Sequence, residues 1–211
     1  MGRLTGRPLD RGRLAGPVLD TARDLLGAVL EVDSLDGTVV LVLSEVEAYA
    51  GPVDPASHAY RGRTRRNAVM FGPPGFLYVY FVYGMHWCCN VVCAPDGEAS
   101  AVLLRAGRVV AGEATARSRR PAARSAAELA RGPARLASAL GIDAAANGAD
   151  LLDPASPVRL RVGTPVPDAD VCRGPRVGVA AAGDLPWRLW IGGDPTVSAY
   201  RPGTRRPAQV R

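Results

Sequence analysis

Two acidic side chains and a tyrosine recur with a period of two along one apolar, β-branched run: Glu45, Glu47 and Tyr49. Residues two apart in a β-strand point to the same face, so both carboxylates and the phenol are expected to lie together. A carboxylate held partly out of water at the edge of a pocket can act as a general base toward a water molecule. The alternative is a solvent-facing strand whose glutamates pair with nearby arginines, and the pattern alone slightly favours this alternative.

Two polar residues further along the chain are also candidates for ligand contact. His58 lies in a Pro-rich loop and is either an acid–base group or a hydrogen-bonding loop residue. Asn90 lies in the otherwise apolar run Trp-Cys-Cys-Asn-Val-Val-Cys. Because a buried amide needs hydrogen-bond partners, Asn90 either satisfies local backbone groups or reads a ligand.

The most informative pattern is a pair of strand-like runs, 76–83 and 86–94, separated by a Gly-Met pair. This spacing is typical of a β-hairpin. Tyr78 and Tyr80 share one face of it, whereas Tyr83 falls at the turn. A large aromatic side chain exposed at a hairpin tip indicates a partner surface. In a basic chain one fitting partner is a nucleic acid, whose minor groove accepts side-chain wedges. The alternative is that Tyr83 folds back onto the core.

The overall composition sets limits on the chemistry. The 211 residues, 47% of them hydrophobic, suffice for one domain that buries roughly 70% of its unfolded surface. The net charge of +6 fits a polyanionic partner, although a solvated basic surface explains it nearly as well. The chain contains arginine but no lysine. Schiff-base catalysis at a side chain needs a lysine amine, so only the N-terminal amine remains for it, and lysine-based covalent catalysis is excluded.

The four cysteines, Cys88, Cys89, Cys93 and Cys172, are expected to be buried free thiols. The adjacent pair points to opposite faces of any strand, and no signal peptide opens the chain, so a reducing compartment is expected. Their spacing is not that of a zinc site, and we expect neither a metal nor a cofactor. No apolar run reaches the roughly 20 residues that span a bilayer. We therefore expect a cytoplasmic protein without membrane contact.

The elements that position these residues follow from hydrophobic periodicity and turn signals. Besides the hairpin, they are helices over 17–30 and 133–140 and strands over 39–48, 100–105, 158–162, 176–180 and 187–192. A long ordered loop over 51–75 joins the acidic strand to the hairpin. Long loops in compact domains are usually functional, so this loop is expected to contribute to the site.

The chain is expected to form one domain over residues 17–200, without a dividing linker. Residues 1–16 are rich in Arg, Gly and Pro and are expected to form a flexible basic arm, and 201–211 a frayed basic tail. Residues 111–131 place several arginines among Ala and Ser, which indicates a mobile Arg-rich insertion. We interpret this insertion as a phosphate-contacting segment, with a solvated loop as the alternative.

An ordered set of segments carries a resemblance to one known family. The segments are Glu45–Tyr49 (EVEAY), Asp54–His58 (DPASH), Gly62–Phe71 (GRTRRNAVMF), Pro74–Met85 (PGFLYVYFVYGM), Ala101–Ala106 (AVLLRA), Gly132–Leu136 (GPARL) and Arg176–Val179 (RVGV). In this order they closely resemble the alkyladenine (3-methyladenine) DNA glycosylase family, in the type that has a single mixed α/β domain rather than helix-hairpin-helix units. The resemblance spans about residues 18–200.

The resemblance implies an α+β fold, in which one mostly antiparallel, curved β-sheet has surrounding helices and a protruding β-hairpin. It implies a monofunctional DNA glycosylase of base excision repair, which flips alkylated purines out of duplex DNA and hydrolyses the N-glycosidic bond. The expected substrates are 3-methyladenine and 7-methylguanine, with hypoxanthine and ethenoadenine as further candidates. Because the chain lacks lysine, the reaction is expected to stop at the abasic site without lyase activity.

The resemblance also implies roles for individual residues. Glu47 resembles the general base that activates the attacking water, and Arg105 the residue that helps to hold this water and the target nucleotide. The residues that resemble walls of the base pocket are Tyr49, His58 and Tyr80. Asn90 resembles the side chain that disfavours guanine by clashing with the 2-amino group of that base. Tyr83 resembles the wedge that fills the gap left by the flipped nucleotide. The residues expected to contact the DNA backbone are Arg63, Thr64, Arg66 and Asn67.

Double-stranded DNA with damaged purines is the expected partner, and the chain is expected to act as a monomer on the nucleoid of a bacterial cell. Two other functions remain possible on the sequence: a non-catalytic binder of damaged DNA, and an RNA-binding module with the hairpin as a stacking platform. Glu47 argues against the first, because a binder needs no such carboxylate. A wedge at one tyrosine near an acid fits base extrusion better than single-strand stacking.

Overall fold

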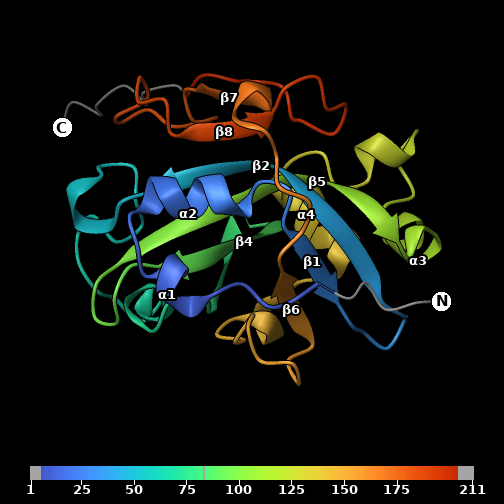
Figure 1. Cartoon of the computed structure of the whole chain (residues 1–211), viewed down its shortest axis with the longest axis horizontal. Helices are drawn as coiled ribbons and strands as arrows, with labels where there is room; N and C mark the ends of the chain where they lie inside the picture. The colour runs from blue at the N-terminus through green and yellow to red at the C-terminus, as the bar shows by residue number, and fades with distance from the viewer. Residues whose placement is uncertain (1–5, 83, 204–211) are drawn as a thin grey trace.

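The computed structural model describes residues 6–82 and 84–203. This part of the chain forms an α+β domain of four α-helices and eight β-strands with short 3-10 turns between them (Figure 1). The helices are α1 (Arg11–Leu14), α2 (Val18–Leu25), α3 (Glu113–Arg119) and α4 (Pro133–Leu140). The strands are β1 (Val29–Val32), β2 (Val39–Tyr49), β3 (Leu77–Val82), β4 (His86–Cys93), β5 (Ser100–Ala111), β6 (Val158–Arg161), β7 (Val171–Gly174) and β8 (Arg188–Ile191).

The strands make one antiparallel sheet in the order β3-β4-β5-β2-β1-β6, and the β7–β8 pair joins it through β2. In Figure 1 this C-terminal pair lies along the top of the molecule, above β2. Helices α2 and α4 pack on the central strands, and α3 packs on α4. The predicted fold class is therefore confirmed, and so are the hairpin and the helix over 133–140.

β2 is the strand at which the sheet divides. Its first half, Val39–Val42, pairs with β1, and its second half, Glu45–Glu47, pairs with β8. The register with β5 shifts on both sides of Glu45, and such bulges bend a strand and re-aim its side chains. Gly107 of β5 lies near this bend, where a Cβ atom would come within 2.7 Å of the Val42 carbonyl oxygen. The half of β2 that carries both glutamates therefore has β5 on one side and β8 on the other, whereas the first half has β1 in the place of β8.

Side chains alternate between the two faces of the four strands β2 to β5. One face packs into the main hydrophobic core, where Val46, Val79, Val91 and Val102 are almost completely buried. Leu136 of α4 belongs to the same core. The opposite face carries the polar and aromatic side chains of the same strands. The period of two therefore separates the residues that stabilise the fold from those that can meet a ligand.

One predicted helix is too long. The helix predicted over 17–30 ends at Leu25, and β1 begins at Val29. Gly27 lies between them with φ +80°, and an added Cβ atom would lie 2.5 Å from the Thr164 carbonyl oxygen. Only glycine tolerates this conformation together with so close an approach of backbone. The apolar periodicity continues through this turn, which is why it suggested a single helix.

The strand predicted over 176–180 is wrong, because β7 covers Val171–Gly174 instead. The Arg176 side chain is fully buried against Asp54, and the Val177 N–H donates to the Glu47 carboxylate at 2.7 Å. The Val177 N–H thus bonds to the Glu47 side chain and the Gly178 N–H to the Arg201 carbonyl oxygen, and the segment forms no strand. The strand predicted over 100–105 is present but continues to Ala111.

Two segments expected to be loose contribute side chains to the core. In the described part of the N-terminal arm, residues 6–16, Leu14 is fully buried. Within 111–131, α3 buries Ala116 and the following turn buries Leu129. An Arg-rich composition hides these few apolar anchors, and the flexibility of the arm and the mobility of the insertion stay predictions.

Candidate active site

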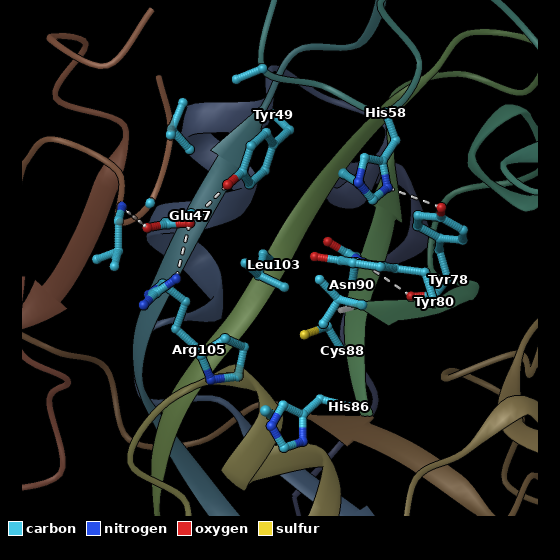
Figure 2. Close-up of a pocket in the computed structure, with 18 of the residues that line it drawn as sticks. Glu47, Tyr49, His58, Tyr78, Tyr80, His86, Cys88, Asn90, Leu103 and Arg105 are labelled. Atoms are coloured by element: carbon cyan, nitrogen blue, oxygen red, sulfur yellow. Dashed lines mark hydrogen bonds and ion pairs between the residues drawn. The ribbon is translucent and has the colours of Figure 1, made fainter. Parts of the chain in front are cut away.

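A cavity of about 320 Å³ opens on the polar face of the sheet (Figure 2). Alternate residues of β2, β5, β4 and β3 line it, together with loop residues near 56–58 and 177–179 and the first two residues of α4, 133–134. The lining side chains with polar or reactive groups are Glu47, Tyr49, His58, Tyr78, Tyr80, His86, Cys88, Asn90 and Arg105. All six side chains predicted for catalysis and base recognition therefore meet in one cavity.

Glu47 is the acidic group of this cavity and is fully buried. Its Oε2 atom accepts a hydrogen bond from the Tyr49 hydroxyl at 2.9 Å, and its Oε1 atom accepts one from the Val177 N–H at 2.7 Å. The Nη1 atom of Arg105 lies 3.3 Å from Oε2. A buried carboxylate without partners is strongly unfavourable, so these contacts compensate its charge and fix its orientation. An oriented carboxylate of this kind can accept a proton from a water molecule in the cavity.

Glu45 binds the arginines behind the cavity and does not line it. Its Oε1 atom accepts hydrogen bonds from Nε of Arg105 at 2.9 Å and from Nε of Arg188 at 2.6 Å, and its Oε2 atom accepts one from the Ser198 N–H at 2.7 Å. Glu45 and Glu47 thus hold Arg105 from two sides. The glutamates pair with arginine, as one interpretation of the sequence predicted, but the accompanying prediction of a solvent-facing strand is wrong.

Four cavity residues lie in one row across the sheet. Glu47 of β2 is opposite Leu103 of β5, Leu103 is opposite Asn90 of β4, and Asn90 is opposite Tyr78 of β3. Figure 2 shows the apolar Leu103 between the acid and the amide. Neighbouring strands are about 4.8 Å apart, so the backbones that carry Glu47 and Asn90 are separated by about 10 Å. The row therefore leaves room for a flat ring between the carboxylate and the far wall.

That far wall is aromatic. The rings of Tyr78 and Tyr80 stack with centroids 5.6 Å apart, and His58 packs edge-on against Tyr80 at 4.5 Å. Nδ1 of His58 lies 3.1 Å from the Tyr78 hydroxyl. Figure 2 shows this group across the cavity from Glu47 and Tyr49. Electron-rich rings therefore border the cavity on two sides.

Burial keeps the phenols and the thiol of the cavity protonated. Burial, and after it the charge of Glu47, raises the pKa of Tyr49 well above 10.0, so its hydroxyl remains a hydrogen-bond donor to the carboxylate. Burial also raises the pKa of Tyr80 and raises that of Cys88 to about 11. His58 is open to the cavity, yet the surrounding protein keeps part of its ring from water, and this desolvation lowers its pKa below the ordinary 6.5. The nearby positive charge of Arg66 lowers the pKa further. The Glu47 carboxylate thus has the Arg105 guanidinium on one side and neutral phenol and thiol groups elsewhere in the cavity.

Asn90 is buried, and its Nδ2 atom donates to the Tyr78 carbonyl oxygen at 3.1 Å. This bond satisfies a local backbone group, which was one of the two predicted uses of the amide. The side chain also lines the cavity, so it is placed where it can meet a ligand. Its role in excluding guanine stays a prediction.

Asn67, a predicted contact to the DNA backbone, has a structural role in the loop. It is buried, and its Nδ2 atom donates to the carbonyl oxygens of His58 at 2.9 Å and Gly62 at 3.0 Å. Its Oδ1 atom accepts from the N–H of Thr64 at 2.6 Å and from its hydroxyl at 3.0 Å. The amide is fully used in shaping the loop, so it is not free for a phosphate.

Arg63, Thr64 and Arg66 remain exposed on this loop. Arg66 donates through Nη2 to the Phe81 carbonyl oxygen at 2.9 Å, which ties the loop to the hairpin. Tyr83, the predicted wedge, lies outside the described residues. The phosphate contacts of this loop and the wedge therefore stay predictions.

Several site residues were missed by the sequence reasoning. Leu103 and Cys88 line the cavity, and each lies two residues before a predicted site residue on the same strand, so the period of two could have identified them. Val177, Arg188 and Ser198 reach the two glutamates from a separate part of the chain. No local pattern marks these contacts, because they depend on how β8 packs against β2.

No group of three or more His, Cys, Asp or Glu side chains in residues 6–82 and 84–203 is arranged to hold a metal ion. In the same part of the chain, no helix has the length and apolar character that crossing a membrane requires. The described cysteines are free thiols, and Cys88 is the one that faces the cavity.

The chain is similar to known proteins along nearly its whole length. Residues 13–195 match the family described as methylpurine-DNA glycosylase. A protein of Streptomyces avermitilis is 58% identical over 201 residues, which cover 94% of each chain, and one of Nocardia farcinica is 55% identical over 88% of each. A Mycobacterium tuberculosis protein is 53% identical over 89% of this chain and 92% of its own. All three carry the name "Putative 3-methyladenine DNA glycosylase". This chain therefore belongs to the methylpurine-DNA glycosylase family of DNA repair enzymes.

Proposed function

We propose that this chain is a monofunctional DNA glycosylase that extrudes alkylated purines from duplex DNA and hydrolyses their N-glycosidic bond. The observation that carries the proposal is the fully buried Glu47 carboxylate, oriented by Tyr49, Val177 and Arg105 across a cavity from an aromatic wall. A base inside a duplex cannot reach such an enclosed acid, so the nucleotide must rotate out of the stack. Tyr83 is the proposed wedge that fills the gap it leaves.

The aromatic lining favours a positively charged base. An N3- or N7-alkylated purine carries a positive charge, which the faces of Tyr49 and Tyr80 attract by about 0.5–2 kcal/mol. The neutral His58 does not oppose this charge. Undamaged purines lack the charge and are held less strongly, so alkylated purines are the proposed substrate class.

Hydrolysis follows from the position of Glu47. The oxygen of a bound water forms a bond to C1′ of the sugar while the bond between C1′ and the purine nitrogen breaks. The proton of the water passes to the Glu47 carboxylate, and the bonding electrons leave with the base. The carboxylate also opposes the positive charge that develops on the sugar, and Arg105 holds the carboxylate in place. A cationic base departs as a neutral molecule, so it needs no acid, whereas hypoxanthine must first be protonated.

Base release from defined duplexes tests this function. Duplexes that each contain 7-methylguanine, ethenoadenine or hypoxanthine, and alkylated DNA that contains 3-methyladenine, are incubated with excess enzyme. We expect free alkylated base and an intact abasic strand that breaks only on alkali treatment, because the chain has no lysine for lyase chemistry. Borohydride should trap no covalent complex. Absence of release from every substrate would overturn the proposal.

The low pKa of His58 predicts a specific pH dependence. His58 is neutral at pH 7 and becomes charged only below its lowered pKa, where an imidazolium would repel a cationic base. Single-turnover excision of 7-methylguanine should therefore fall several-fold on acidification, with part of the fall centred below pH 6.5. In His58→Gln this part should disappear, while any fall due to other groups persists. Identical profiles for the two proteins would contradict this role of His58.

A further inference from the structure

A second groove, of about 450 Å³, adjoins the active-site cavity. Arg105, Pro133 and Val177 line both, so the two spaces meet at the side of the cavity formed by the start of α4 and the loop after β7. The groove is basic: four arginines line it, and no acidic residue does. They are Arg105, Arg131, Arg135 and Arg201.

Three of these arginines are exposed and make no ion pair in the part of the chain that the structure describes. Arg105 is buried and paired with two glutamates, but Arg131, Arg135 and Arg201 are exposed. Within residues 6–82 and 84–203 none of the three makes an ion pair, whereas ten other arginines do. Their charges are therefore available to an external anion.

The backbone fixes these arginines beside the cavity. Nε of Arg131 donates to the Val197 carbonyl oxygen at 2.8 Å, which leaves its two terminal nitrogens for other partners. The Arg201 carbonyl oxygen accepts from the Gly178 N–H at 2.8 Å, next to cavity residue Val177. Arg135 lies in the first turn of α4, where no side chain caps the helix. Arg131 and Arg135 flank the start of α4 and Arg201 lies near the C-terminal end, so the three cations come from two parts of the chain and converge on one groove.

One of these charges also acts on a neighbouring arginine outside the groove. Burial, and after it the nearby charge of Arg135, lowers the pKa of Arg120, which lies beside α4. Like charges brought together in this way are stabilised when an anion binds among them. A phosphodiester backbone supplies several anions in a row, and arginine binds phosphate oxygens through two parallel hydrogen bonds.

We propose that Arg131, Arg135 and Arg201 bind the phosphates of the DNA strand next to the extruded nucleotide. This inference rests on the proposed function, because it places the strand that delivers the base into the adjoining cavity. Val82 and His86 of the hairpin line the same cavity, as do Pro133 and Ala134 at the groove. The strand therefore passes between the hairpin and the groove, across the mouth of the cavity.

The test measures how binding depends on salt. We measure affinity between about 50 and 200 mM salt for an undamaged duplex and for an abasic-analogue duplex. The wild type is compared with the triple variant Arg131→Gln, Arg135→Gln, Arg201→Gln. Each lost phosphate contact lowers the slope of log K against log salt by roughly 0.9, so we expect a total decrease of about 2–3. Both duplexes should show it, because phosphate contacts carry no base information.

Two controls isolate the groove. Arg173→Gln removes one exposed arginine of β7 that lines neither space, and its slope should equal that of the wild type. A triple Arg→Lys variant keeps the charges and should recover most of the slope.

The outcomes separate this inference from the proposed function. An unchanged slope in the triple Gln variant, with the wild type excising base normally, would overturn the groove assignment alone. If the wild type releases no base but the salt slope is still lower in the triple variant, the glycosylase proposal is overturned and the phosphate-binding groove stands. Circular dichroism and thermal unfolding of each variant confirm that the compared proteins are folded.

Discussion

Replacing Asp54 by Asn is expected to lower the free energy of unfolding by about 3–5 kcal/mol and the melting temperature by on the order of 10 °C. Asp54 and Arg176 form a fully buried ion pair, with one carboxylate oxygen 2.5 Å from Nη1 and the other 2.9 Å from Nη2. The substitution keeps the side-chain shape but removes the only negative charge that the structure pairs with Arg176 in the described chain. A guanidinium left in the core without a counter-charge is strongly unfavourable.

The same substitution should also affect the cavity. Arg176 lies 4.6 Å from the ring centroid of Tyr49 and 5.2 Å from that of Trp187, and it donates to the Ala48 carbonyl oxygen. The pair thus fixes the end of β2 just beyond Glu47. Chemical unfolding monitored by tryptophan fluorescence measures the loss of stability, and the excision rate of the folded fraction measures the second effect.

An exposed ion pair provides the matched control. Glu113 and Arg117 lie 2.6 Å apart on the surface of α3, with about half of each side chain accessible to solvent. Glu113→Gln makes the same chemical change and should cost less than about 1 kcal/mol, because water replaces the lost contact. Equal losses for Asp54→Asn and Glu113→Gln would refute the stabilising role of the buried pair.

The sequence was sufficient to predict features that depend on local patterns. The period of two along β2 placed Glu47 and Tyr49 on one face, and the structure joins them by a hydrogen bond of 2.9 Å. The same period placed Tyr78 and Tyr80 together, and their rings stack. Strand periodicity is set by backbone geometry alone, so a few residues are enough to reveal it.

Features that depend on distant segments were not predictable in this way. Arg176 was assigned to a strand because its neighbours are apolar, yet its partner Asp54 is 122 positions earlier. The contact between Glu45 and Ser198 spans 153 positions. Such pairs form only after β8 docks on β2, and nothing in the local sequence of either partner encodes the docking. The few apolar anchors of the N-terminal arm and of the 111–131 segment were missed for the same reason, since they act only within the assembled core.

Glu47→Gln is expected to have the largest effect on catalysis, a loss of roughly 10²–10⁴-fold in the rate of base release. Glutamine has almost the same shape as glutamate, so the cavity should stay open and the aromatic wall intact. The amide cannot take the proton of the attacking water, and it carries no charge to oppose the developing oxocarbenium ion. Binding depends on the wall and the phosphate contacts instead, so affinity for an abasic-site analogue should be retained.

Glu98→Gln is the control for this substitution, because Glu98 is exposed and does not line the cavity. It removes the same charge from the protein surface, and we expect its rate and affinity to match the wild type. Equal activity of the Glu98 and Glu47 variants would mean that the buried carboxylate has no part in the reaction.

The most direct test of this site is the single-turnover release of 3-methyladenine from alkylated duplex DNA by Glu47→Gln, at enzyme concentrations that saturate the DNA. Saturation removes any difference in binding, so the rate reports on bond cleavage itself. If Glu47 activates the water, the Glu47→Gln variant should bind the DNA but release almost no base. Release at the wild-type rate from that complex would contradict the assignment of Glu47 as the general base.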